Sequence, residues 1–238
     1  MDLGIGGKRA AVAAATAGLG FASARALVDA GARVVVCGRS RERVDAAVAR
    51  LGGGAIGVEC DVSTQGGAAM FVEMAAQRLG GIDILVANGG GPKPGNFASL
   101  KVDDYLPALQ QSLLSVVAMC EAAVPAMRER KWGRVVAITS ISVRQPIANL
   151  MLSNTARAGV TGFLKTLARE VAADGVTVNS VQPGIHATDR ITQLYGAAPD
   201  AGQLGIPAGV VGDPSDFGKV VAFLCGEPAR FKIGRAHV

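Results

Sequence analysis

Short runs of apolar, mostly β-branched residues alternate along the chain with longer stretches in which apolar residues recur every three or four positions. The short runs predict buried strands and the longer stretches predict amphipathic helices, because these two patterns match the geometry of each element. Glycines at positions 31 and 80 fit the left-handed position that ends a helix. Strands are predicted over 9–14, 32–37, 55–60, 82–87, 134–139 and 176–181, and helices over 19–30, 41–51, 66–79, 102–130 and 152–173.

This alternation predicts an α/β fold, a doubly wound (Rossmann) parallel sheet with helices on both faces. The length of 238 residues and the absence of a linker in the sequence indicate a single domain over 1–238. Segment 189–214 is rich in glycine and proline, so we expect an irregular, mobile substrate loop there. Ligands of such sheets sit beyond the carboxyl ends of the strands, which directs attention to the loops that follow them.

Composition narrows the class of protein. Half of the residues are apolar, which excludes general disorder. Two histidines and four scattered cysteines without a CxxC pair predict neither a metal site nor a disulfide framework, and they favour a reducing cytoplasm. The net charge of +5 is dispersed with few aromatics, which favours an anionic ligand over nucleic acid. No apolar run approaches the roughly 18–20 residues of a membrane span, and no signal peptide is visible.

The turn after the first predicted strand is the first candidate site. Gly18 and Gly20 open a helix there, which lets the backbone approach a pyrophosphate, although a simple tight turn has the same pattern. After the second strand, Gly38 stands where an acidic residue would bind the ribose of NAD, and Arg39 offers a cation to a 2′-phosphate. This favours NADP over NAD. For Arg41 and Arg43 a surface role at a helix start is the competing interpretation.

Together these motifs resemble the short-chain dehydrogenase/reductase family, in particular its 3-oxoacyl-carrier-protein reductase-like members. Gly18-Leu19-Gly20 matches the end of the TGxxxGxG motif, Ala87-Asn88-Gly89-Gly90 stands at NNAG, and Asn179 to Gly184 matches the NxVxPG loop. The resemblance covers nearly the whole chain. The cofactor-binding residues that it implies, with Arg39 and Arg157 added, are Thr16, Gly18, Leu19, Gly20, Arg39, Asp61, Val62, Asn88, Gly89, Arg157, Pro183, Gly184 and Thr188.

The sequence departs from the family pattern at the catalytic tetrad of Asn, Ser, Tyr and Lys. Ser140 keeps the serine position, but Ser153 replaces the tyrosine of YxxxK and Arg157 replaces its lysine. Ser112 stands at the asparagine position. Ala13 and Ala14 also replace the threonine and glycine of the phosphate turn, and alanine takes a positive φ less easily than glycine.

These replacements change the expected chemistry. The hydroxyl of Ser153 is a far weaker acid than a phenol, and Arg157 stays charged, although its guanidinium can still hold ribose hydroxyls or a phosphate. Ser140, Ser153 and Arg157 are the predicted catalytic residues. Donors that could compensate are Ser140 with Ser142, His186 and Tyr195. The alternatives are an exposed loop position for His186 and a packing role for Tyr195. Arg144 is either a contact for an anionic substrate or an ordinary surface arginine.

Two functions therefore stay open. The first is an NADP-dependent oxidoreductase of atypical site that transfers a hydride between nicotinamide and a small-molecule carbonyl or alcohol. The second is a catalytically impaired protein of the same fold that binds the nucleotide as a sensor or structural subunit. The resemblance also implies a homodimer or homotetramer through helices 102–130 and 152–173. Family members end in a strand with a Val-Asp-Gly-Gly stretch, whereas residues 234–238 stop where that stretch would begin.

Overall fold

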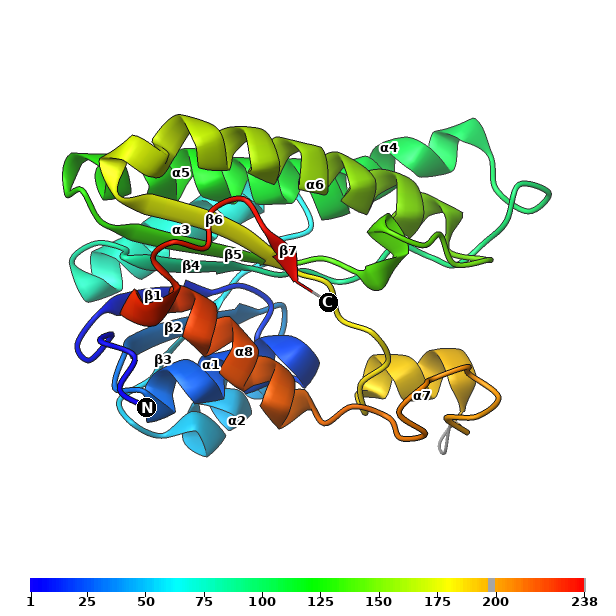
Figure 1. The fold of residues 1–238 in the computed structure, drawn as a ribbon, viewed down its shortest axis with the longest axis horizontal. Helices are drawn as coiled ribbons and strands as arrows, with labels where there is room; N and C mark the ends of the chain where they lie inside the picture. The colour runs from blue at the N-terminus through cyan, green and yellow to red at the C-terminus, as the bar shows by residue number, and fades with distance from the viewer. Residues whose placement is uncertain (197–199, 238) are drawn as a thin grey trace.

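A single seven-stranded parallel sheet forms the centre of the molecule in a computed structural model that describes residues 1–196 and 200–237 (Figure 1). The strand order is β3-β2-β1-β4-β5-β6-β7. This confirms the predicted doubly wound parallel sheet. The strands are β1 (Arg9–Val12), β2 (Arg33–Gly38), β3 (Ile56–Glu59), β4 (Ile84–Ala87), β5 (Gly133–Ile138), β6 (Val176–Val181) and β7 (Ala236–His237).

Helices cover both faces of the sheet (Figure 1). One face carries α1 (Gly18–Asp29) and α8 (Pro214–Cys225), with α2 (Arg41–Leu51) at its β2–β3 end. The opposite face carries α3 (Gln65–Leu79), α5 (Ser115–Glu129) and α6 (Met151–Val171). The remaining helical turns are η1 (Val102–Asp104), α4 (Tyr105–Leu109), η2 (Gln110–Leu114), η3 (Ile141–Val143), η4 (Ala172–Asp174), α7 (Asp189–Tyr195) and η5 (Glu227–Ala229).

Side chains of one apolar strand contribute alternately to two hydrophobic cores, one on each face of the sheet. In β1, Ala10 and Val12 pack in the core that includes Leu27 of α1 and Val221 of α8. Ala11, between them, belongs to the opposite core with α3, α5 and α6. Because successive strand side chains point to opposite faces and both faces are covered, consecutive positions 10–12 of this strand are all apolar.

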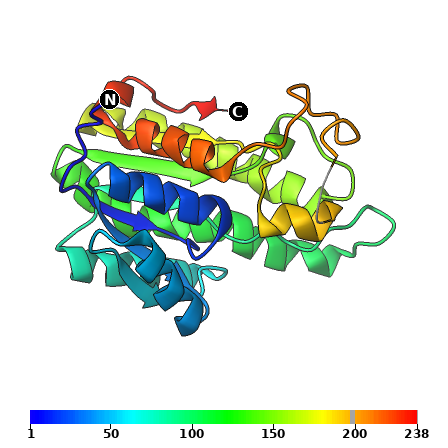
Figure 2. The ribbon, with the colours of Figure 1, turned by 90° about the horizontal axis from the view of Figure 1, so that it is seen from below.

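The order in which strands are added to the sheet reverses between β1 and β4. These two strands are neighbours, but β2 and β3 lie on one side of β1 whereas β5 and β6 lie beyond β4. The loops that leave β1 and β4 therefore diverge and open a crevice at the carboxyl ends of the strands. Figure 1 and Figure 2 show α7 and the loop after residue 200 at one end of the molecule.

Most predicted elements are confirmed within two residues at each end, and four features differ. The stretch 102–130 is divided by the π-helical turn η2. Segment 189–214 contains the short helix α7, so it is less irregular than expected, and its residues 197–199 lie outside the described residues. Helix α8 was not predicted. The short strand β7, which pairs with β6, was not predicted either.

The helical stretch Val102–Glu129 is long and apolar enough to cross a membrane by length and composition alone, although no continuous apolar run of that length occurs in the sequence. Met119 and Met127 of α5 are completely buried in the core against the sheet. A core helix of a soluble protein passes the same test, and the packing of α5 fits that explanation.

Of the four small residues of α6 expected at a subunit contact, one is buried and three are exposed. Ala156 is completely buried, and a Cβ atom on Gly159 would lie 3.2 Å from Leu113 Cδ2. Gly159 therefore allows α6 to approach η2 within the same chain. Ala158, Gly159 and Gly162 are exposed, so they remain available for an external contact, and the homo-oligomer stays a prediction.

Candidate functional site

A pocket of about 1150 Å³ opens at the carboxyl ends of the first six strands. The loops that follow β1 to β6 all contribute to its wall. The structure therefore brings together, along one crevice, every residue predicted for cofactor binding and for catalysis. These residues are Thr16, Gly18, Leu19, Gly20, Arg39, Asp61, Val62, Asn88, Gly89, Ser140, Ser153, Arg157, Pro183, Gly184 and Thr188.

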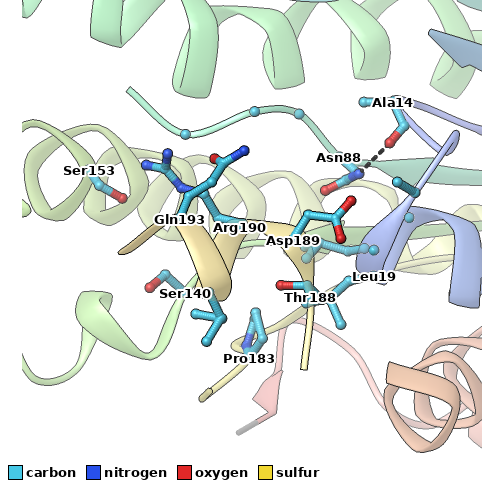
Figure 3. A pocket seen from close by; sticks show the side chains of 18 of the residues that line it. Ala14, Leu19, Asn88, Ser140, Ser153, Pro183, Thr188, Asp189, Arg190 and Gln193 are labelled. Atoms are coloured by element: carbon cyan, nitrogen blue, oxygen red, sulfur yellow. Dashed lines mark hydrogen bonds between the residues drawn. The ribbon is translucent and has the colours of Figure 1, made fainter. Parts of the chain in front are cut away.

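The turn after β1 is held in place from the neighbouring strand. The Asn88 side chain follows β4, and its Nδ2 donates to the carbonyl oxygens of Ala13 and Ala14 at 3.2 and 3.1 Å (Figure 3). Gly20 permits this approach, because a Cβ there would lie 2.6 Å from Asn88 Nδ2 and 2.7 Å from the oxygen of Ala14. Gly18 has a φ of +56° and begins α1, whose first N–H groups face the pocket end of the turn.

Ala14 adopts a left-handed backbone conformation, which glycine takes more easily than alanine. Its φ is +47°, which is costly for a residue with a Cβ atom. The backbone N–H of Ala14 donates to the buried sulfur of Cys37 at 3.3 Å, and its carbonyl accepts from Asn88. Burial raises the pKa of Cys37 to about 12, so this thiol is a protonated structural contact. Contacts on both sides of the residue thus hold a strained backbone in place.

Replacing Ala14 with glycine should raise the free energy of unfolding by roughly 0.5–1 kcal/mol, because relief of the left-handed strain exceeds the entropy that glycine adds to the unfolded chain. Chemical denaturation of the variant measures this difference. Ala13→Gly is the matched control, since Ala13 is buried without a positive φ, and that change should destabilise the fold. Equal destabilisation by both changes would contradict the strain at Ala14.

The loop after β2 presents exposed positive charge to the pocket. Arg39 and Arg43 both line it, and within the described chain neither guanidinium forms an ion pair. Arg41, in contrast, points away and pairs with Asp45 at 2.9 Å. A Cβ on Gly38 would lie 2.5 Å from Thr16 Cγ2, so a carboxylate-bearing side chain at position 38 would collide with the phosphate turn.

Ser140 lies at the start of the loop that follows β5. Its Oγ accepts from the N–H of Ser142 at 3.1 Å, which leaves its own hydrogen free to be donated into the pocket. Ser153 and Arg157 are one turn apart on α6, and both line the pocket. Arg157 Nη1 donates to the carbonyl oxygen of Ile138, at the end of β5, at 2.9 Å. The three side chains therefore line the β5 side of the crevice.

A family model described as enoyl-(acyl carrier protein) reductase matches residues 13–238. The 3-oxoacyl-[acyl-carrier-protein] reductase FabG of Haemophilus influenzae is 34% identical over 229 residues, which cover 96% of this chain and 94% of that protein. The chain belongs to the short-chain dehydrogenase/reductase family. It is reductase-like in sequence over nearly its whole length, as the motifs predicted.

Solved structures of family members show the same architecture. L-sorbose reductase from Gluconobacter frateurii, complexed with NADPH and L-sorbose, superposes with a TM-score of 0.90 at 27% identity and covers 100% of this chain and 96% of that one. A 7α-hydroxysteroid dehydrogenase complexed with NADH and 7-oxo glycochenodeoxycholic acid gives 0.91 at 26% identity, covering 99% and 94%. The family thus includes members bound to either nicotinamide cofactor.

Arg157 is the most unusual feature of this short-chain dehydrogenase/reductase. Burial, and next the charge of Arg190, lower the pKa of Arg157 to about 10, so it remains a cation at neutral pH. Because this pKa lies below that of the unfolded chain, the charge destabilises the fold at neutral pH. The penalty is relieved only as the pH rises above about 10.

The asparagine position of the family tetrad no longer reaches the pocket. Ser112 lies in the π-helical turn η2, is buried, and within the described residues its hydroxyl has no hydrogen-bond partner. π-helical turns frequently mark functional sites. The side chain of this stretch that lines the pocket is Gln111.

The other candidate donors divide between the pocket and packing roles. His186 lines the pocket, but its ring packs edge-on against Phe217 at 5.3 Å and its Nδ1 lies 3.3 Å from the carbonyl oxygen of Gly184. Tyr195 lines the pocket from the end of α7 and is partly exposed. Ser142 is buried outside it, and Arg144 lines a separate cavity of about 310 Å³. Arg144 is therefore no contact for a substrate in the main pocket.

Several polar pocket residues were not assigned to the site from the sequence, among them Arg43, Gln111, Arg190 and Gln193. A surface role was the competing interpretation for Arg43. Its position four residues after Arg39 could have indicated that it belongs to the site. Arg190 follows Thr188 by two positions, but only the tertiary structure shows that its side chain crosses the pocket. Its Nη2 donates to the carbonyl oxygen of Pro92, in the loop after β4, at 3.3 Å.

Proposed function

We propose that the protein is an NADP(H)-dependent oxidoreductase that interconverts a carbonyl compound and an alcohol. The observation that carries this proposal is the continuity of one crevice from Arg39 and Arg43, through the turn at Gly18, to Ser140. Two unpaired guanidinium groups suit the 2′-phosphate of NADP, which NAD lacks. The NADPH complex of L-sorbose reductase supports the same cofactor.

The residues present fit this cofactor along its length. The turn at Gly18 and the start of α1 would hold the pyrophosphate, Asp61 and Val62 would border the adenine, and Thr188 would contact the carboxamide. The Cβ of Thr188 would lie 3.8 Å from a Cβ on Gly18, so the loop after β6 closes over this turn. When bound, the nicotinamide would supply or accept the hydride.

The chain itself would orient the substrate and stabilise charge on its oxygen. The free hydrogen of Ser140 Oγ would be donated to the substrate oxygen, where negative charge grows as a carbonyl is reduced. The positive charge of Arg157 would stabilise the same oxygen from the α6 side. Neither Ser153 nor Arg157 is an effective acid at neutral pH, so the proton would come from solvent.

This function is tested by following NADPH consumption with a panel of ketones and aldehydes. Wild-type protein should consume the cofactor above background, and Ser140→Ala should lower kcat by about a hundredfold while NADPH affinity stays within twofold. Circular dichroism and the melting temperature serve as controls for folding. Turnover that is insensitive to Ser140→Ala would contradict the proposed role of this serine.

The second candidate is a nucleotide-binding protein without turnover. The replacement of the family tyrosine and lysine by Ser153 and Arg157 favours it. Such a protein should gain thermal stability from NADPH, because a ligand that binds the folded state stabilises it, yet should consume no cofactor with any substrate. The same assay therefore separates the two functions.

A further inference from the structure

The pocket extends beyond the region that a dinucleotide would occupy. In Figure 3 the Arg190 and Gln193 side chains lie on the Ser153 side of the pocket, whereas Ala14, Leu19 and Asn88 lie on the opposite side. Arg157 approaches the same region from α6, one turn after Ser153. This arginine-containing half of the pocket lies next to Ser140, where the reacting oxygen would be held.

Two guanidinium groups therefore face one cavity. Each forms a single hydrogen bond to a backbone oxygen, Arg157 to Ile138 and Arg190 to Pro92, and each has further N–H donors. Within residues 1–196 and 200–237, neither is paired with a carboxylate. Asp189 also lines the pocket, but its carboxylate lies on the Leu19 side in Figure 3.

Like charges that converge without a counterion are unfavourable unless a ligand supplies the opposite charge. The charge of Arg190 contributes, after burial, to the lowered pKa of Arg157, so the two cations do influence each other. A planar guanidinium binds a carboxylate through two parallel hydrogen bonds, and such charge-assisted bonds are stronger than neutral ones. The pair is therefore suited to an anionic group with two oxygens.

We propose that the substrate is an oxo acid, or the corresponding hydroxy acid, whose carboxylate binds between Arg190 and Arg157. This inference rests on the proposed function and adds its substrate class. The carboxylate would place the carbonyl at Ser140. In the reduction, the carbonyl carbon gains the hydride of NADPH, the electron pair of the C=O π bond moves to the oxygen, and the oxygen takes a proton from solvent. NADPH is thereby oxidised to NADP⁺.

The cofactor pyrophosphate is the other source of anionic oxygens in this pocket. Arg190 follows Thr188 in sequence, but its side chain extends to the Ser153 side, away from Leu19 and the phosphate turn (Figure 3). This direction favours the substrate carboxylate. Replacing Arg190 distinguishes the two sources. If Arg190 binds the substrate carboxylate, the affinity for the acid falls; if it binds the pyrophosphate, the affinity for NADPH falls.

The test measures the binding of 2-oxobutanoate, 2-oxoglutarate and benzoylformate, each beside its uncharged methyl ester or dimethyl ester, at constant ionic strength. Titrations are made on NADPH-loaded and on cofactor-free protein. At least one acid should bind the NADPH-loaded wild type at least about tenfold more tightly than its ester. Arg190→Gln should remove this preference and leave the Kd of NADPH within twofold. Arg144→Gln, which removes a charge from the separate cavity, should change neither value.

Two results would overturn the proposal. One is a Kd for NADPH that rises about tenfold or more in Arg190→Gln while the preference for the acid survives, which would assign Arg190 to the pyrophosphate. The other is an equal affinity of the wild type for all three acids and their esters. If NADPH itself fails to bind, the proposed function fails. The titration of cofactor-free protein then tests the anion site separately. A preference for the acid over its ester that is lost in Arg190→Gln would support that site.

Discussion

Replacing Arg39 with glutamate should weaken NADPH binding by about a hundredfold or more and leave NADH binding almost unchanged. A charge-assisted contact to the 2′-phosphate would be lost, and a carboxylate would face that phosphate in its place. NADH has a hydroxyl at this position and tolerates a carboxylate. Titration of both cofactors by intrinsic or cofactor fluorescence measures the two dissociation constants.

Arg41→Glu is the matched control for this experiment. Arg41 lies two positions further along the chain, is exposed, and pairs with Asp45 instead of lining the pocket. The control carries the same change of charge near the same helix start, so it reports any general electrostatic effect. An equal loss of NADPH affinity in both variants, or an equal loss of NADPH and NADH in Arg39→Glu, would contradict a phosphate contact at Arg39.

The double substitution Ser153→Tyr with Arg157→Lys should raise the rate of carbonyl reduction by about a hundredfold. A tyrosine whose phenol pKa is depressed by a neighbouring lysine transfers protons as a general acid, which contributes roughly 10²–10⁴-fold. The two positions lie four residues apart on α6 and both line the pocket beside Ser140. The substitution therefore restores the side chains that the family pattern uses.

The control for this variant is Ser153→Phe with Arg157→Lys, which adds the same ring without the phenol. Steady-state rates of both variants are measured with NADPH and an uncharged ketone, so that the loss of Arg157 as an anion contact does not obscure the gain. An increase that is equal in the two variants would assign it to packing. No increase in either would mean that the pocket has been reshaped for another use.

The sequence predicted the sheet and most helices because these elements have regular apolar patterns. The missed helix α8 also has one, with Phe217, Val221, Leu224 and Cys225 buried on one face. Its start signals, Asp213 as the N-cap and Pro214 in the first turn, could have revealed it. Helix α7 has no buried residue, so no apolar periodicity marks it.

The cofactor half of the candidate site could be predicted because its motifs are local. Gly18 and Gly20 act within one turn, and Arg39 lies directly after its strand. Ser140, Ser153 and Arg157 were predicted from the family pattern. Arg190 could not be, because it comes from α7 and lines the same cavity as Arg157 of α6 only in the folded chain. The strain at Ala14 was foreseen as a difficulty, but the alanine adopts the positive φ instead of reshaping the turn, since Asn88 and Cys37 hold it.

Calorimetric titration of the purified protein with NADPH tests the central claim most directly. One NADPH should bind per chain, at least about tenfold more tightly than NADH, because only NADPH has the 2′-phosphate for Arg39 and Arg43. The absence of a binding signal at millimolar NADPH would contradict the account, since the crevice at the strand ends would then not be a dinucleotide site.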